Sequence, residues 1–397
     1  MSDVAQDLPT RKMELSLGPS HPAMHGTIRI NIELDGEVIT ASETEVGYLH
    51  RGFEKDCESV HWAQCMPYTD RLNYVSPLCN NFGFSMGVEK LFEVEVPERA
   101  EYIRVIMSEL SRMCDHLTCN GAMGMETGGF TAFLYLIEAR EILWDLIEEV
   151  TGARLTINYA RFGGVAHDLP DGWIERCRQG LKDAMALLDD ADKMLTRNRI
   201  FIDRLNGVGV LDKKDAIALG VTGPFLRASG VEYDVRKAHP YFVYDRMDFD
   251  IPVGDRGDTY DRWLVRLEEI RQSRRIVEQA LDQIPPGKVL LDDPRFALPP
   301  KDQVYTRIEG LMNHFKLIME GAQVPPGEVY CYTEGGNGEL GFYLVSDGSG
   351  KPYKCRVRGP CFATMQVLDN CLLPGSMLSD VVPIFGSVNM IGGECDR

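Results

Sequence analysis

Alternating apolar and polar positions mark the first fifty residues of the chain. Within 27–34 every second residue is apolar, which places these side chains on one side of an extended strand: Ile28, Ile30, Ile32 and Leu34. The dipeptide Asp35-Gly36 that follows is typical of a two-residue hairpin turn, and a second strand-like run covers 37–46. The pattern predicts an antiparallel meander with one buried face.

Farther along, apolar residues recur at steps of three and four, which is the spacing of helices. Pro97 and Gly121 are expected to bracket the first long helix, and a second covers 130–150. Asp171 is expected to cap a third helix that ends near Leu195. Such spacing, sustained over long helices, predicts a helical bundle.

Two more helices are expected before strands return. One begins near Asp258 and ends before Pro285, and the other covers 301–321 between two pairs of prolines. Three strand-like runs follow, at 328–332, 341–345 and 353–357.

Between the first two of these runs, residues 336–341 match the pattern G-x-G-x-x-G. A nucleotide-binding loop of this pattern must open a helix, whereas a strand follows here. We therefore interpret the segment as a hairpin and exclude direct binding of NAD through it.

These elements predict an α+β fold in three parts. We expect an N-terminal antiparallel β lobe at 1–54 and a central helical bundle at 55–320 with a β insertion near 221–250. A C-terminal mixed α/β lobe at 321–397 is expected to return to the first lobe.

Composition and charge exclude several classes of function. The chain has 397 residues, of which 44% are hydrophobic and 26% charged, as in folded globular proteins. Its 60 acidic residues outnumber its 42 basic ones and give a net charge of −18, which argues against a nucleic-acid binder. No apolar run is long enough to span a bilayer, and the first residues do not resemble a signal peptide. We expect a cytosolic chain that reaches a membrane only through a partner.

The cysteines argue against a metal site. There are 11 of them, with no C-x-x-C pair and no spacing typical of a disulfide framework. We interpret them as buried thiols, because sites built on soft thiolate ligands would require such pairs.

Two histidines stand four residues apart at His21 and His25. On a helix this spacing would place both on one face, as in a zinc pair, but Pro22 and Gly26 indicate a loop. Two other interpretations stay open: a structural loop whose imidazoles bond to the backbone, and a functional loop beside a pocket. A histidine near pKa 6.5 suits donation of a hydrogen bond or a proton at neutral pH.

Arg71 and Tyr74 stand three residues apart, within one helical turn. From the residues alone, a tyrosine hydroxyl satisfied by local hydrogen bonds is favoured. Arg112 and His116, with Asp115 beside them, have helical spacing, and there a structural ion pair is favoured.

Segments spread over nearly the whole chain keep the order seen in one protein family: 18–26, 47–55, 71–74, 163–170, 226–230, 254–258 and 396–397. In these segments the chain resembles the 49-kDa subunit, also called the D subunit, of respiratory complex I, the NADH-quinone oxidoreductase. That family is similar to the large subunit of [NiFe] hydrogenases, which hold nickel through two C-x-x-C pairs. Because these pairs are missing, the resemblance implies a hydrogenase-like fold whose former metal cavity holds a quinone head.

The resemblance also implies roles for particular residues. Tyr74 and His25 match the residues that hydrogen-bond and protonate the quinone, and His21 and Glu126 would lie at the substrate. Glu126 stands where the family has Asp, and a carboxylate there that accepts a hydrogen bond from His25 would raise the pKa of His25. Asp115 is the alternative partner.

Arg71 matches a residue beside the terminal [4Fe–4S] cluster of a neighbouring subunit. His167 stands one position after the place where the family often has a histidine near that cluster. The chain itself would bind no cofactor, with quinone as substrate. Expected partners are the cluster-bearing B subunit, the C subunit and the membrane H subunit. The chain would be a peripheral protein on the cytoplasmic side of the inner membrane.

The expected function is that of the quinone-site subunit of a proton-translocating NADH-quinone oxidoreductase. One alternative is a [NiFe]-hydrogenase-type large subunit, disfavoured by the missing C-x-x-C pairs. Another is a non-catalytic docking scaffold. The choice between ubiquinone and menaquinone stays open.

Overall fold

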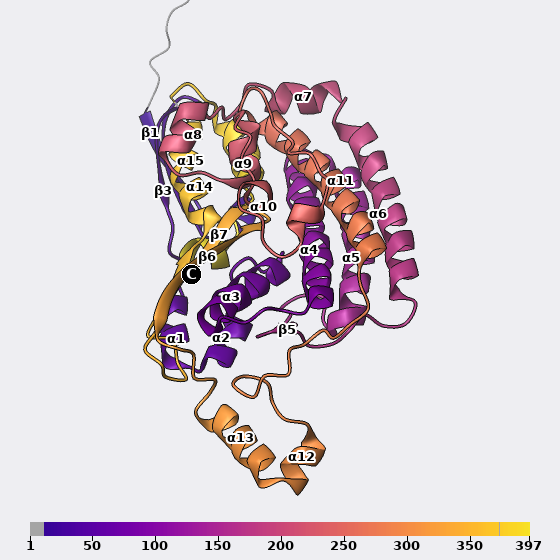
Figure 1. The fold of residues 1–397 in the computed structure, drawn as a ribbon. Coiled ribbons are helices and arrows are strands. Elements are labelled where there is room, and N and C mark those ends of the chain that lie inside the picture. The colour runs from indigo at the N-terminus through magenta and orange to yellow at the C-terminus, as the bar shows by residue number, and fades with distance from the viewer. Residues whose placement is uncertain (1–11, 373) are drawn as a thin grey trace, which may run out of the picture.

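Long helices and small sheets make up the computed structural model, which describes residues 12–372 and 374–397. In Figure 1 four long helices stand side by side on one side of the molecule: α4 (Glu98–Glu126), α5 (Phe130–Thr151), α6 (Trp173–Leu195) and α11 (Thr259–Gln283). The sheets and the C-terminal helices lie on the other side. The mixed class of helices and strands predicted from the sequence is confirmed.

Helix α4 runs through the middle of the molecule, and its predicted apolar positions are all buried: Ile103, Ile106, Leu110, Met113 and Leu117. Pro97 is its N-cap rather than its first residue. The prediction that Gly121 ends this helix is wrong, because the helix continues to Glu126. A Cβ on Gly121 would lie 3.3 Å from the ring of Phe133, so the glycine permits close packing of α5 instead.

The other long helices begin and end near the predicted residues. Helix α5 is followed by Gly152 with φ of 81°, which is typical of a helix C-terminus. Gly172, not Asp171 as predicted, is the N-cap of α6. Helix α11 begins next to Asp258 as predicted, and the carboxylate of Asp258 caps it by accepting a hydrogen bond from the backbone of Asp261.

The N-terminal meander is confirmed. Its strands β1 (Lys12–Leu17), β2 (Arg29–Asp35) and β3 (Val38–Glu45) form an antiparallel sheet in the order β1-β2-β3. The alternating isoleucines and Leu34 are buried, as the pattern requires.

A second three-stranded sheet lies near the C-terminus, with strands β6 (Gly327–Gly335), β7 (Gly338–Ser346) and β8 (Lys354–Arg358). Gly335 pairs with Gly338, so Gly336 and Asn337 form a two-residue turn. The predicted hairpin is therefore confirmed at the site of the glycine pattern.

The predicted β insertion near 221–250 is wrong. This segment contains the short helices α9 (Gly223–Ala228) and α10 (Val235–Ala238) and a 3-10 turn at Tyr244–Arg246, but no strand. The reason is local capping: Pro224 occupies the start of α9, and the carboxylate of Asp234 accepts from the backbone of Arg236.

The predicted helix at 301–321 is two helices, α12 (Lys301–Thr306) and α13 (Ile308–Met319). Arg307 between them is extended, with φ of −129° and ψ of 133°. Both helices project away from the bundle in Figure 1, and no residue in them is buried.

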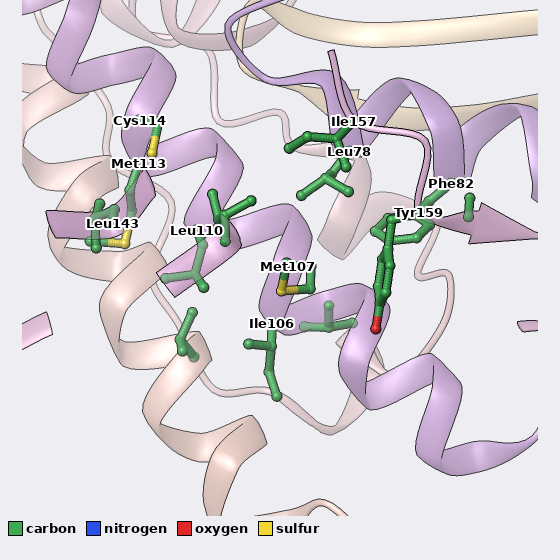
Figure 2. Close-up of a cluster of buried hydrophobic side chains, with 14 of the residues drawn as sticks. Leu78, Phe82, Ile106, Met107, Leu110, Met113, Cys114, Leu143, Ile157 and Tyr159 are labelled. Carbon is green, nitrogen blue, oxygen red and sulfur yellow. The ribbon is translucent and has the colours of Figure 1, made fainter. Parts of the chain in front are cut away.

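Two hydrophobic clusters hold the molecule together. The larger joins the bundle to the sheet β6–β8, and Figure 2 shows part of it, with Leu110 and Met113 of α4 beside Leu143 of α5. The smaller joins the N-terminal sheet to four C-terminal helices: α14 (Pro360–Gln366), α15 (Leu368–Cys371), α16 (Val381–Val388) and α17 (Gly392–Asp396). The first and last parts of the chain therefore share one core, while the predicted domain boundaries stay a prediction.

The remaining elements connect these parts: α1 (Phe53–Ser59), α2 (Trp62–Thr69), α3 (Pro77–Phe92), β4 (Ala160–Arg161), β5 (Gly164–Val165), α7 (Arg199–Leu205) and α8 (Lys213–Ala218). Within the described ranges, no helix combines the length and the apolar character needed to cross a membrane.

Candidate functional site

The two histidines near the N-terminus lie on a loop between β1 and β2, not on one face of an α-helix. His21 caps a 3-10 turn at Pro22–Met24, and its Nδ1 accepts a hydrogen bond from the backbone of Ala23 at 3.2 Å. His25 follows the turn in the left-handed region, with φ of 54°. The two imidazoles therefore have different environments. Among the described residues, no group of three or more His, Cys, Asp or Glu side chains has the geometry to hold a metal ion.

His25 contacts the end of α16. Its Nδ1 lies 3.4 Å from the carbonyl oxygen of Met390, and its ring meets that of Phe385 edge-on at 5.3 Å between centroids. Loss of water around the imidazole lowers the pKa of His25, against a smaller opposing effect of the Met390 carbonyl. The neutral imidazole therefore donates from Nδ1 and leaves Nε2 as an acceptor.

Glu126 is the last residue of α4, and its side chain packs against α16, the helix whose end His25 contacts. Its Oε2 is buried against Gly386, where a Cβ would overlap it, and it has no hydrogen-bond partner among the described residues. Burial raises the pKa of Glu126 to about 8, so the carboxyl is mostly protonated at neutral pH. The predicted hydrogen bond to His25 is absent from the described part of the chain, and the expected rise in the pKa of His25 is wrong in direction.

Tyr74 lies half-buried on the connection between α2 and α3. Burial raises its pKa, and the nearby Cys361 and Asp115 add to this, while Arg51 opposes it. The phenol is thus a weak acid in the free protein.

A buried carboxylate holds the Tyr74 loop. Asp115 of α4 accepts hydrogen bonds from the Asn73 amide, the Ser76 hydroxyl and the Asn389 amide, each at 2.8 Å. Asn73 in turn accepts from the backbone of Ser76 at 3.2 Å. Residues on both sides of Tyr74 are therefore bonded to α4, which holds the loop that carries the phenol.

The same network connects Tyr74 to His25. Asn389 bonds to Asp115, and the next residue, Met390, bonds to His25. Asn389 caps α16 in the left-handed region, with φ of 55°. The structure thus attaches the two predicted catalytic residues, which come from separate loops, to consecutive residues after one helix.

Arg71 lies beside the Tyr74 loop with an exposed side chain. It pairs with Asp70 at 2.8 Å, and its backbone oxygen accepts from Arg51 at 2.8 Å. Its charge therefore lies at the surface of the chain.

His167 lies elsewhere. It lines a cavity of about 420 Å³ together with Met66 of α2, Arg161, Phe296 and Ile318 of α13. Tyr74 and His25 are not among the residues that line this cavity. The structure therefore does not bring His167 to Tyr74 and His25.

Sequence reasoning missed several members of the buried network, above all Glu394, Cys361 and Asn337. Glu394 accepts from the thiol of Cys361 at 2.8 Å and from the amide of Asn337 at 3.2 Å. The structure also shows why Gly393 stands next to Glu394, since a Cβ there would overlap the backbone oxygen of Arg71. A glycine that close to another segment indicates that α17 packs on the site.

Comparison with known proteins decides the family. The family described as "Respiratory-chain NADH dehydrogenase, 49 Kd subunit" has a sequence model that matches residues 126–397. The NADH-quinone oxidoreductase D 1 subunit of Sorangium cellulosum is 59% identical over 398 residues, covering 100% of this chain and 98% of the relative. The chain belongs to this family.

Other relatives of the 49-kDa subunit family agree. The NADH-quinone oxidoreductase D subunit of Myxococcus xanthus is 58% identical over 396 residues, covering 100% of this chain and 95% of the relative. The NADH-quinone oxidoreductase C/D subunit of Bdellovibrio bacteriovorus is 49% identical over 395 residues, which is 100% of this chain and 70% of that relative. The resemblance stated from the ordered segments is confirmed, and the chain is a D-type subunit of an NADH-quinone oxidoreductase.

Proposed function

We propose that this chain forms the quinone-reducing end of the complex, with Tyr74 and His25 as the groups that deliver protons to the two quinone oxygens. The observation that carries the proposal is their shared anchor: Asn389 holds the Asp115 network under Tyr74, and Met390 holds His25. Two polar groups fixed from separate loops to one rigid helix end suit a flat ligand with a carbonyl at each end.

Reduction of a quinone takes two electrons and two protons. The electrons would come from a [4Fe–4S] cluster in a neighbouring subunit, and this chain would bind no cofactor. A phenol with a raised pKa is a poor acid toward a neutral quinone, but it protonates a fully reduced, basic one. Proton transfer from Tyr74 would therefore follow the arrival of electrons.

His25 would act differently. In the neutral form its Nδ1 faces Met390 and its Nε2 carries no hydrogen, so it accepts rather than donates. It would deliver a proton only after gaining one. Because its pKa is lowered, the charged form is strongly acidic toward the quinone.

His21 and Glu126 would serve as further substrate contacts. The Nδ1 of His21 is occupied by the Ala23 backbone, which leaves Nε2–H free to donate to the ligand. The protonated carboxyl of Glu126 would donate in the same way. Arg71 and His167 would lie toward the cluster, where the exposed charge of Arg71 would favour the reduced form.

The partners follow from the family. The fused C/D relative supports the C subunit as a neighbour of this chain. The cluster-bearing B subunit and the membrane H subunit are proposed as further partners, with the chain peripheral on the cytoplasmic side of the inner membrane. The hydrogenase-like arrangement of lobes is likewise proposed.

Photolabelling tests this function. A photoreactive quinone analogue added to the assembled complex should label the peptides that contain Tyr74 or His25, and excess quinone should prevent it. Labelling that misses both loops would favour a docking scaffold. Stoichiometric nickel in the purified chain would instead favour the hydrogenase alternative.

A further inference from the structure

Helix α13 exposes the side on which most of its apolar residues lie. Counted at about 100° per residue, six apolar side chains share about one third of the helix circumference. All six are exposed: Ile308, Leu311, Met312, Phe315, Ile318 and Met319. A surface helix normally turns its apolar side to the core, so a patch of this kind marks a place where another molecule binds.

The other side of α13 is held by this chain. Gly310 lies against α12, because a Cβ there would be 2.6 Å from the backbone oxygen of Gln303. Leu317 packs against the larger hydrophobic cluster, and the polar Asn313 and His314 are half-buried. In Figure 1 the arm formed by α12 and α13 projects from the body of the molecule. The arm therefore holds α13 with its apolar side open to solvent.

The apolar surface of α13 continues into the cavity of about 420 Å³ that His167 also lines. Ile318 of α13 and Leu298, which precedes α12, both line this cavity and are 52% and 55% exposed. The body of the chain contributes Met66 and Phe162. The patch and the cavity therefore form one continuous apolar surface, to which the arm and the body both contribute.

A cation at this surface has no acidic partner among the described residues. Arg161 of β4 lines the cavity and is exposed, and its guanidinium donates only to oxygens of Asn158 and Ala160. A guanidinium beside an apolar surface is complementary to a carboxylate, which it can bind through two hydrogen bonds. The charge of Arg161 therefore indicates an acidic side chain on the binding molecule.

Two other kinds of molecule fit this surface less well. A helix that lies on a membrane carries many Lys and Arg residues on its polar side, whereas the charged residues of α13 are one acid and one base, Glu309 and Lys316. A second copy of this chain would bring together two molecules of net charge −18, which repel each other. A different protein is therefore the favoured occupant.

We propose that α13 docks into an apolar groove of another subunit of the complex, and that this subunit places a carboxylate against Arg161. The inference deepens the proposed set of partners and rests on that part of the proposed function. A helix that binds a groove does so through apolar side chains three, four and seven residues apart, which in α13 are Ile308, Leu311, Met312 and Phe315. With a length of about 18 Å, α13 fits a groove of about three helical turns.

Photocrosslinking in membranes that contain the assembled complex tests the occupant. In Phe315→p-benzoylphenylalanine, irradiation should join this chain to one other subunit, through an apolar peptide that contains Asp or Glu. The same probe at Ile200, an exposed isoleucine on α7, is the control and should not give this adduct. An adduct with lipid or with a second copy of this chain, a peptide without an acid, or no adduct would overturn the proposal.

A double variant measures how much the patch contributes to assembly. In Leu311→Gln/Phe315→Gln, the amount of this chain in the membrane-bound complex should fall at least about tenfold, because two central apolar contacts are lost. The thermal midpoint of the purified chain should stay within about 2 °C, since neither side chain is buried. Ile200→Gln is the matched control and should leave both measurements unaltered. Normal assembly of the double variant, or a large drop in its thermal midpoint, would contradict a docking role.

The outcomes separate this inference from the quinone function. If the double variant assembles normally while Tyr74→Phe loses quinone reduction, the docking surface is wrong and the quinone function stands. If the double variant fails to assemble while Tyr74→Phe reduces quinone normally, the docking surface stands and the quinone function fails.

Discussion

The side-chain amide of Asn73 donates to Oδ2 of Asp115 at 2.8 Å, and this bond joins the Tyr74 loop to the longest helix in the described chain. Ser76 donates to the same oxygen at 2.8 Å. Since these two residues flank Tyr74, one buried carboxylate holds the loop that carries the phenol. The placement of Tyr74 therefore depends on α4 rather than on the loop itself.

Replacing this carboxylate should loosen the loop. In Asp115→Asn, one oxygen that accepts hydrogen bonds becomes an amide that faces a donor. Hydrogen bonds to a charged group contribute about 1.5–3 kcal/mol each, so we expect the free energy of unfolding to fall by roughly 2–3 kcal/mol. Chemical denaturation of the purified chain measures this. Asp168→Asn, at a half-exposed ion pair with Arg99, is the control and should cost less than about 1 kcal/mol.

Tyr74→Phe keeps the ring and removes only the hydroxyl. The loss of one hydrogen bond to substrate costs about 1–3 kcal/mol, and the proton donor is lost as well, so quinone reduction should fall at least about tenfold. Oxidation of NADH by artificial acceptors should be unchanged in the assembled complex, because that reaction does not need the quinone site. Near-normal quinone turnover would remove Tyr74 from the site.

The lowered pKa of His25 predicts that the rate of quinone reduction changes with pH on the acid side of neutrality. The imidazole is neutral at pH 7 and gains its proton only below the ordinary titration range of histidine, so its contribution to the rate should rise as the pH falls into the acid range. His25→Gln should remove this rise. His239→Gln, at an exposed histidine, should keep it. A rise that survives in His25→Gln would assign the titration to another group.

The raised pKa of Glu126 predicts a loss of stability at alkaline pH. Its folded-state pKa of about 8 lies above its unfolded value of 4.5, so its contribution is complete below pH 4.5 and is lost as the pH rises through about 8. Glu126→Gln is neutral at every pH, and thermal denaturation should show it to be the more stable form at pH 9, with little difference at pH 4. Because Glu126 does not bond to His25, this variant should leave the acid-side rise of His25 in place. If Glu126→Gln shifted the pH at which the rate rises, the predicted interaction between Glu126 and His25 would be supported after all.

A buried ion cluster in the bundle predicts a large loss of stability. The guanidinium of Arg227 lies 2.7 Å from Glu269 and 2.9 Å from Glu334, and the side chains of all three are at most 1% exposed. Arg227→Met would leave two buried carboxylates without their counter-ion, which costs about 3–5 kcal/mol. Arg178→Met removes an exposed pair with Asp282 and should change the free energy of unfolding by less than about 1 kcal/mol.

Periodicity predicted the elements whose packing follows from their own sequence. The strand at Arg29–Asp35 and the helix at Trp173–Leu195 were found because one apolar face decides each of them. Gly121 was misread because its role depends on Phe133, a residue of another helix. The segment 221–250 was misread because side-chain caps on its backbone, rather than alternation, decide its conformation.

In the candidate site, too, contacts between distant segments could not be predicted from the sequence. Tyr74 and His25 were predicted through family resemblance, which stays a prediction, and the structure connects the loops of both to the end of α16. Glu394 and Cys361 were missed because no pattern in a sequence relates residues that meet only after the chain returns on itself. The prediction that Glu126 raises the pKa of His25 was wrong for a related reason. The pKa of an imidazole depends on all its neighbours rather than on one aligned position.

The core shared by the N-terminal sheet and helices α14–α17 has a consequence for biosynthesis. The strands of this sheet leave the ribosome long before the helices that cover them. At about 5–20 residues per second, the apolar face of the sheet stays uncovered for roughly 20–70 s. The nascent chain therefore exposes an apolar surface throughout most of its translation. Because such a surface is prone to aggregation, we expect a chaperone to bind these early strands.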